Sequence, residues 1–586
     1  MSTTQRPTKP MVAPGVIPMA ATAFTVVLSV VGGGYLSGVL AGTGGALPSG
    51  MYGVLDVFKG LFLHPADPAL AWPEGSRPGG PVLTWGCIAV LAALCLWLGM
   101  FISSKMTIRR AARRVRESGF ADRTELARAG VSEKAAVRKA KATRLSLADV
   151  PVRRIVAEAE TTKIATLYTG GDGVYLQYRD GLTCTGPTGA GKTWRVCWKG
   201  VTDAVGPVVA TSTRGDLLRS TWAQRSEVGR VEVFDPEGLT AIPNPMRWSI
   251  LDGCDDPEVA KRRAEALVQA MPMDDTSNAG YWNGKAAMLM RGYLYAAAVK
   301  NKDLMDLRIW ASSRNVKLVR DVLERDLPDW HAELEQALDS KSDSSDDVVS
   351  ACARLLEPLA SPKLMAAMNV PRSESADLHA LMTEGKNTVY VVSEGHSASA
   401  AAFTTVLSAE MYHVAKTHGL TRPDDKIDPP LRMVLDEMNN VAAIPNMPDL
   451  ITDSGGRGIQ IWALVHSALQ NEKRWGRIGG QRLSTDSPAR MFLPGLGDES
   501  ELAALSRLMG SRDEYISHDP RSAPRSVPVM ALNEIREMPE DQALMMFRNA
   551  KPMKVRLPSV WDVPELSKRV RANQAVFDEF CAKGTR

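Results

Sequence analysis

Eight consecutive residues of this chain form a phosphate-binding loop of the G-x-x-x-x-G-K-[ST] type. Glycines permit the backbone angles that turn successive N–H groups toward one phosphate. Lys192 is expected to reach the β- and γ-phosphates, and the Thr193 hydroxyl is expected to ligate Mg²⁺. The motif therefore predicts a nucleoside triphosphate site with ATP and Mg²⁺ as cofactors, but it does not say how the energy is used. It consists of Gly186, Pro187, Thr188, Gly189, Ala190, Gly191, Lys192 and Thr193, directly after the apolar run LTCT.

A pair of acidic residues ends a later apolar run, LRMVLDEMNN. In a P-loop protein, such a strand end holds the metal and activates water. Asp436 is expected to hold Mg²⁺ through water beside Thr193, and Glu437 to orient and deprotonate the attacking water. Two solvated acids at an ordinary strand end are the alternative, so the assignment depends on the phosphate-binding loop earlier in the chain.

Three polar residues follow these acids and could complete the site. Arg457 lies in the Gly-rich turn SGGRG, where a ring-shaped motor can present an arginine finger to the γ-phosphate of a neighbouring subunit. His466 and Gln470 follow the apolar run IQIWALV, and a polar residue there could sense the γ-phosphate. From the pattern alone, an exposed loop arginine and a structural histidine remain open alternatives.

The elements around these residues alternate between short apolar runs and helical stretches. The runs are rich in β-branched residues without polar alternation, which is typical of parallel strands covered by helices on both faces. A P-loop in such a sheet predicts an α/β fold with a RecA-like P-loop ATPase domain. Residues 255–381 are helical in pattern, so we predict an all-helical insertion in the sheet. The expected strands are 208–212, 231–235, 387–393, 432–436, 459–465 and 490–494.

Two apolar segments near the N-terminus, 16–40 and 82–104, are each long enough to cross a bilayer. Basic residues precede the first segment, and six Lys or Arg residues between Lys105 and Arg116 follow the second. Lys and Arg collect on the cytoplasmic side, which predicts a multi-pass protein of the cell (plasma) membrane with its ATPase body in the cytoplasm. The same basic residues could contact membrane lipids. A cleaved signal peptide and buried core helices are the alternatives.

Composition sets wider bounds on the protein. A length of 586 residues fits several globular domains, and a formal charge of +4 does not by itself indicate nucleic acid. The seven cysteines form no CxxC pair and the eight histidines form no zinc-ligand spacing, so free thiols are expected and no metal site of the relaxase kind is predicted. We expect a membrane anchor (1–105, with an outer loop at 41–81), a basic helical linker (106–160), two parts of the nucleotide-binding domain (161–254 and 382–562), the all-helical insertion (255–381) and a charged tail (563–586).

Taken together, these features resemble the type IV coupling proteins, the membrane-anchored ATPases of conjugative DNA transfer and type IV secretion. The resemblance covers nearly the whole chain, and the sequence is similar to members from mobile elements of high-GC Gram-positive bacteria. Its most specific part is VLDEMNNVAAIPNMPDLITDSGGRGIQIWALVHSALQNEKRWG, joined by GPTGAGKT, FDPEGLTAIPNPMRWSIL and FLPGLGDESELAALSRLMG.

The resemblance implies a homo-hexameric ring that pumps single-stranded DNA, delivered with its relaxase as a relaxosome, toward type IV secretion channel proteins. It implies that Arg457 acts in trans and that the helical insertion meets the relaxase–DNA substrate. Where the family usually has glutamine, this chain has His466. The role of His466 in sensing the γ-phosphate is therefore open, and Gln470 is the alternative.

Three other functions remain possible from the sequence. A double-stranded DNA translocase of the septal chromosome-pump (FtsK-like) kind would favour an added winged-helix domain, for which the segment after Trp561 is short. A non-motor membrane receptor would use ATP only to order a docking surface for a relaxosome or effector protein. A protein-secretion ATPase would usually carry several P-loop domains, whereas this chain has one such motif.

Overall fold

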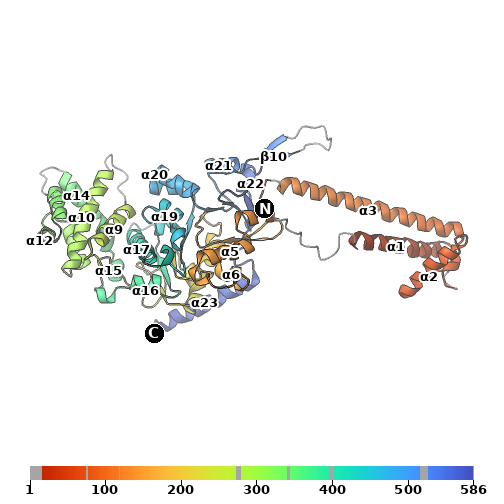
Figure 1. Ribbon diagram of the computed structural model, residues 1–586, viewed down its shortest axis with the longest axis horizontal. Helices are drawn as coiled ribbons and strands as arrows, with labels where there is room; N and C mark the ends of the chain where they lie inside the picture. The colour runs from red at the N-terminus through yellow and green to blue at the C-terminus, as the bar shows by residue number, and fades with distance from the viewer. Residues whose placement is uncertain are drawn as a thin grey trace. The chain divides into compact units, whose positions relative to one another are not determined.

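The computed structural model describes residues 16–45, 47–73, 77–117, 119–271, 279–338, 344–394, 400–514 and 525–584 (Figure 1). The chain divides into two compact units, Met1–Glu117 and Ser118–Arg586. The predicted phosphate-binding loop and the acidic strand end both belong to the second unit.

The first unit is built on two long helices, α1 (Val16–Leu40) and α3 (Pro81–Glu117), joined through α2 (Gly50–Leu63) and η1 (Pro68–Ala71). Small residues let α1 and α3 approach closely, as in membrane helix pairs. A Cβ added to Gly33 would lie 2.7 Å from the Ile88 Cα, and the hydroxyls of Ser37 and Thr84 are 2.9 Å apart.

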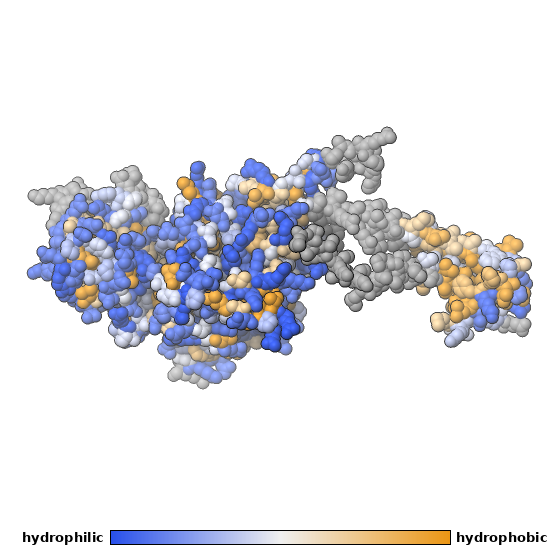
Figure 2. All heavy atoms as spheres, viewed as in Figure 1, coloured by the Kyte–Doolittle hydropathy of each residue, from blue (hydrophilic) through white to orange (hydrophobic). Residues whose placement is uncertain are grey.

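Within the described residues, one helix is long and apolar enough to cross a membrane, Pro81–Met100. It overlaps the second predicted span, 82–104. The first predicted span is a helix with the expected bounds, but its described apolar part, Phe24–Leu40, is shorter. Its crossing therefore stays a prediction. Figure 2 shows hydrophobic side chains over much of this unit, in contrast to the mostly hydrophilic face of the second unit.

An eleven-stranded sheet organises the second unit, in the order β2-β1-β13-β12-β9-β3-β8-β7-β4-β6-β5. The strands from β9 to β5 in this order pair in parallel, and the others pair antiparallel. All six predicted runs are strands of the parallel part. The strands are β1 (Thr162–Leu167), β2 (Gly173–Leu176), β3 (Leu182–Thr185), β4 (Val208–Ser212), β5 (Val231–Phe234), β6 (Thr388–Val392), β7 (Leu431–Leu435), β8 (Ile459–Val465), β9 (Ala489–Phe492), β12 (Gln542–Phe547) and β13 (Met553–Arg556), with β10 (Ser511–Glu514) and β11 (Arg525–Pro528) as a separate hairpin.

Both faces of the parallel part are covered. Successive residues of a strand point to opposite faces; accordingly, Val209 belongs to one hydrophobic core and Ala210 to another. This explains why the strand sequences are apolar without alternation. The helices of this unit outside the insertion are α4 (Arg123–Ala129), α5 (Glu133–Thr143), α6 (Ala157–Glu160), α7 (Trp198–Thr202), α8 (Asp216–Ser226), α17 (Ala401–Leu420), α18 (Met438–Val441), α19 (Met447–Asp453), α20 (Ala468–Thr485), α21 (Glu499–Met509), α22 (Leu532–Arg536) and α23 (Pro564–Gly584).

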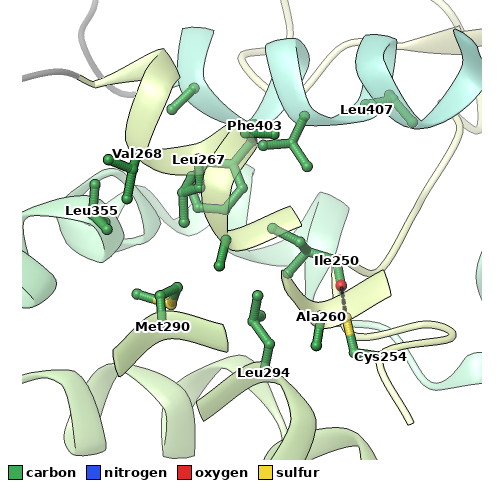
Figure 3. Close-up of a cluster of buried hydrophobic side chains, with 14 of the residues drawn as sticks. Ile250, Cys254, Ala260, Leu267, Val268, Met290, Leu294, Leu355, Phe403 and Leu407 are labelled. Carbon is green, nitrogen blue, oxygen red and sulfur yellow. Dashed lines mark hydrogen bonds between the residues drawn. The ribbon is translucent and has the colours of Figure 1, made fainter. Parts of the chain in front are cut away.

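Between β5 and β6, all the described regular elements are helices, and the α-helices begin at Pro257, within the predicted insertion 255–381. Asp256 caps α9 by accepting a hydrogen bond from the Glu258 N–H, with proline at the first helical position. Figure 3 shows Leu267 and Met290 of this segment in one apolar cluster with Phe403 of α17. The insertion therefore shares its core with the sheet layer. Its helices are α9 (Pro257–Ala270), α10 (Ala279–Val299), α11 (Leu304–Ala311), α12 (Lys317–Asp326), α13 (Pro328–Leu338), α14 (Ser344–Leu356), α15 (Pro362–Met368) and α16 (Leu378–Thr383).

Two segments that we predicted as a linker and a tail contribute to the core of the second unit. Leu126 and Val131 lie in the same hydrophobic core as Val570 and Phe577 of α23. The Ala/Arg/Lys-rich pattern of the linker hid its apolar face, because alanine buries little area per residue and scores weakly as hydrophobic. The compact ATPase unit therefore includes residues of the predicted linker (106–160) and of the predicted tail (563–586).

A buried ion pair joins the insertion to the sheet layer and carries a stability prediction. Glu410 of α17 accepts hydrogen bonds from Arg262 (2.8 Å) and Arg263 (3.1 Å) of α9. Burial alone would raise the pKa of Glu410, but the Arg263 charge and the hydrogen bonds from both arginines outweigh it and lower that pKa. We expect Glu410→Gln to reduce the free energy of unfolding by about 3–5 kcal/mol near neutral pH, because it leaves the buried charge of Arg263 and the partly buried charge of Arg262 without their counter-charge.

The sign of the pH dependence follows from the lowered pKa of Glu410. The stabilisation is present above the unfolded pKa and is lost as the pH falls through the folded pKa. The difference in free energy of unfolding between the native chain and Glu410→Gln should therefore decrease as the pH falls. Urea titrations at several pH values measure this difference. Glu265→Gln, which removes an exposed carboxylate on α9, the helix that carries Arg262 and Arg263, is the matched control. Equal stability of native chain and Glu410→Gln at neutral pH would contradict this role.

Candidate active site

The predicted polar residues gather at the carboxyl edge of the parallel sheet. The phosphate-binding loop follows β3, Asp436 and Glu437 follow β7, and His466 follows β8, which lies between β3 and β7. Ligands of open α/β sheets bind outside this edge. Residues 243 positions apart, Thr193 and Asp436, thereby come into hydrogen-bond contact.

Two glycines of the loop adopt backbone angles that favour glycine. Gly189 and Gly191 have φ of 85° and 79°. A Cβ at Gly189 would meet nothing within 4 Å, so the requirement there is conformational. The helix that follows opens with a π-helical stretch, Thr193–Cys197, before α7. N–H groups at such a loop and helix start form an anion-binding concavity.

Lys192 lies deep in this loop with only 7% of its surface exposed. Its Nζ donates to the carbonyl oxygens of Gly186 (2.6 Å) and Pro187 (3.2 Å) and lies 3.0 Å from the Nδ1 of His466. Burial lowers the pKa of Lys192, and the charge of Asp436 opposes that effect. A buried ammonium among mainly neutral acceptors is well suited to bind a phosphate.

The Thr193 hydroxyl donates to the Asp436 Oδ2 at 2.9 Å. Asp436 is 5% exposed, and burial raises its pKa despite the hydrogen bond from Thr193. The Thr211 hydroxyl donates to the Asp436 carbonyl at 3.1 Å and fixes the strand end. Hydroxyl and carboxylate oxygens fit Mg²⁺, which is usually held by one or two carboxylates together with substrate phosphates. Among the described residues, no group of three or more His, Cys, Asp or Glu side chains offers a complete metal site.

Glu437 occupies an unusual backbone conformation, with φ of 52° at the N-terminal boundary of α18. Such angles cost energy in a non-glycine residue and cluster at functional sites. Its Oε1 lies 3.7 Å from the Nε2 of His466, and its Oε2 accepts from the Asn440 amide at 3.4 Å. The histidine, and then Asn440, lower the pKa of Glu437 against the effect of burial, which favours an ionised carboxylate.

His466 bridges the lysine and the glutamate. Because an ammonium can only donate, Nδ1 must accept from Lys192, and the imidazole proton then sits on Nε2, facing Glu437. A glutamine side chain also offers one acceptor and donors, so either residue type suits this position. Gln470 lies in the first turn of α20, where its buried Oε1 has no hydrogen-bond partner among the described residues.

Arg457 does not join this cluster. It lies in η8 (Ser454–Arg457), at the amino end of β8, whereas His466 follows the carboxyl end. A seven-residue strand separates its ends by about 20 Å. The Arg457 Nε donates to Asp453 at 3.0 Å.

Sequence reasoning missed a contact between the phosphate-binding loop and the C-terminal region. The Arg195 guanidinium donates to the Leu557 carbonyl at 2.7 Å, across 362 positions in sequence. Neither residue belongs to a motif, so no local signal could have revealed the contact.

Comparisons with known proteins agree with this arrangement. Residues 430–540 match a family described as the TraM recognition site of TraD and TraG. The bacterial conjugative coupling protein TrwBdeltaN70, unbound, is similar at TM-score 0.53 and 17% identity, covering 67% of this chain and 88% of that chain. The plasmid coupling protein TrwB in complex with ADP and Mg²⁺ gives TM-score 0.51 and 17% identity over 67% and 89%, and its complex with the ATP analogue ADPNP gives 0.51 and 16% over 65% and 86%. At these identities the likeness shows the fold. No curated protein sequence matches the chain.

Proposed function

We infer that this chain is a type IV coupling protein, an ATPase that acts in conjugative DNA transfer. The observation that carries the inference is the meeting of Lys192 and Thr193 with Asp436, Glu437 and His466 at one edge of a RecA-like sheet. The match of residues 430–540 to the TraM recognition site of TraD and TraG supports a relaxosome protein as its partner.

Each residue of the site has a proposed part in ATP hydrolysis. The loop Gly186–Thr193 would bind the triphosphate, and Thr193 with Asp436 would hold Mg²⁺. When bound, the metal neutralises charge that develops on the phosphate oxygens. Glu437, ionised beside His466, would accept a proton from the attacking water. His466 would hold the side chains of Lys192 and Glu437 in position relative to each other. The buried Gln470 Oε1 would be available to a ligand.

The wider assembly is also a proposal. In a homo-hexamer, Arg457 would reach the nucleotide of the next subunit, since about 20 Å of strand separates it from its own site. The ring would draw single-stranded DNA, delivered with its relaxase, toward type IV secretion channel proteins. The apolar helix Pro81–Met100 supports an anchor in the cell membrane.

The test is whether DNA drives the ATPase. We expect single-stranded DNA to raise the turnover of the full chain in detergent or lipid nanodiscs severalfold, because a translocating motor couples substrate binding to hydrolysis. Steady-state phosphate release is measured against the concentration of single-stranded and double-stranded DNA of equal length. Lys192→Ala serves as the control for contaminating ATPases, since it removes the buried ammonium of the loop.

The other functions give different results in the same assay. A rate that does not respond to DNA over a wide concentration range would favour a membrane receptor. Preferential stimulation by double-stranded DNA would favour a septal chromosome pump. Either result would overturn the proposed motor on single-stranded DNA.

A further inference from the structure

An exposed tryptophan lies beside the start of the P-loop helix. Trp561 is 39% exposed, and none of the other tryptophans of the second unit, all described, is exposed to this extent. Its ring centroid is 5.0 Å from that of Trp194, at an interplanar angle of 62°. Trp194 directly follows Thr193, the last residue of the phosphate-binding loop. An aromatic ring that is partly open to solvent therefore lies beside the residues that would bind a nucleotide.

The segment that carries Trp561 is fixed to the P-loop helix. The Val560 N–H donates to the Trp194 carbonyl at 3.2 Å, and Arg195 donates to the Leu557 carbonyl. Within the segment, the Ser559 N–H donates to the Asp562 carboxylate at 2.8 Å. These contacts fix the backbone on either side of Trp561 against the P-loop helix, and the indole itself packs edge-on against Trp194.

Sheet topology places this segment on a definite side of the loop. Strand β13 pairs antiparallel with β12, and β12 pairs antiparallel with β9, so β13 ends at the same edge as β3. In the order of strands, β13 and β9 lie on one side of β3, while β8 and β7, with His466 and Glu437, lie on the other.

The orientation of a bound triphosphate follows from these positions. Its γ-phosphate belongs beside Lys192 and Glu437, and the loop N–H groups hold the α- and β-phosphates. We therefore expect the ribose and base to leave the loop on the side away from Glu437, where the segment Leu557–Asp562 follows β13. Every nucleobase has a π-face, and indole rings stack on such faces.

We propose that Trp561 is the stacking face for the base of the bound nucleoside triphosphate, with Trp194 supporting it edge-on. This inference rests on the proposed nucleotide site and adds the subsite for the base. Because stacking reads no hydrogen-bond pattern, the subsite would hold any purine nucleotide with similar strength and would contribute affinity rather than choice of base.

The test separates the contribution of the base to binding affinity from the contribution of the phosphates. We expect Trp561→Ala in the full chain to raise the Kd of a non-hydrolysable ATP analogue about tenfold and to leave the Kd of inorganic tripolyphosphate unchanged, both by calorimetry with Mg²⁺. Trp561→Phe should restore most of the analogue affinity. Phe580→Ala is the matched control: it removes another exposed aromatic ring of the C-terminal region, one that stacks on Trp222 at 4.4 Å rather than on Trp194.

Each remaining outcome has a defined meaning. An unchanged Kd for the analogue in Trp561→Ala would overturn the base subsite while leaving the proposed function in place. Equal weakening of analogue and tripolyphosphate would also overturn it, because the substitution would then act through the loop. If the native chain bound neither ligand, the nucleotide site itself would be refuted, and the base subsite with it.

Discussion

Glu437→Gln should hydrolyse ATP about 10²–10⁴ times more slowly than the native chain while still binding it. The amide keeps the size of the side chain and can still face His466 and Asn440, but it cannot accept a proton from water. His466 lowers the pKa of the native carboxylate against the effect of burial, so the loss should persist across the neutral range. Single-turnover hydrolysis measures the rate of the chemical step, and equilibrium binding measures the affinity of the site for ATP.

Two variants make this result specific to Glu437. Lys192→Ala should lose both binding and turnover, because it removes the buried ammonium that lies against Gly186 and Pro187. Glu499→Gln removes an exposed carboxylate at the start of α21 and should leave both unchanged. Full hydrolysis by Glu437→Gln would discard its assignment as the base.

Arg457→Ala should reduce turnover about 10³–10⁵-fold, the range measured for arginine fingers, and part of the loss should be recovered by mixing. In a ring of Arg457→Ala and Lys192→Ala subunits, some interfaces combine an intact loop with an intact arginine from the neighbour. This follows from the length of β8, which keeps Arg457 out of its own site. ATPase rate is measured against mixing ratio after dissociation and reassembly.

The control for this experiment is another surface arginine. Arg482→Ala removes a guanidinium of α20 that pairs with Asp449 and Asp486, and it should leave turnover unchanged. Absence of recovery at every mixing ratio would contradict action across subunits.

The positions of short motifs in the fold could be predicted from the sequence. The loop Gly186–Thr193 and the pair Asp436–Glu437 each sit where their motif requires, and the six apolar runs are parallel strands. The likeness to TrwB confirms the fold, and the match of residues 430–540 to the TraM recognition site of TraD and TraG agrees with the resemblance to coupling proteins. Roles of individual side chains in hydrolysis stay predictions.

Features that depend on contacts between residues far apart in the sequence could not be predicted from the sequence. Strands β1, β2, β12 and β13 form the antiparallel side of the sheet, and short runs such as MKVR give no clear periodicity. The tail was read from its charges, yet Val570, Phe577 and Cys581 make a buried stripe one or two turns apart along α23. The bridge through His466 joins three segments of the chain, and a single sequence does not say which segments meet.

Strand β8 is buried at every position and pairs with β3 and β7 on its two sides. It carries His466 at one end and the turn of Arg457 at the other. Because its hydrogen-bonded neighbours hold its register, it cannot lengthen or slip by fractions of a residue. In a closed ring, a strand of fixed length between His466 and Arg457 would couple the nucleotide site of one subunit to the nucleotide site of the next subunit. The order in which the subunits hydrolyse ATP would then depend on this coupling rather than being random.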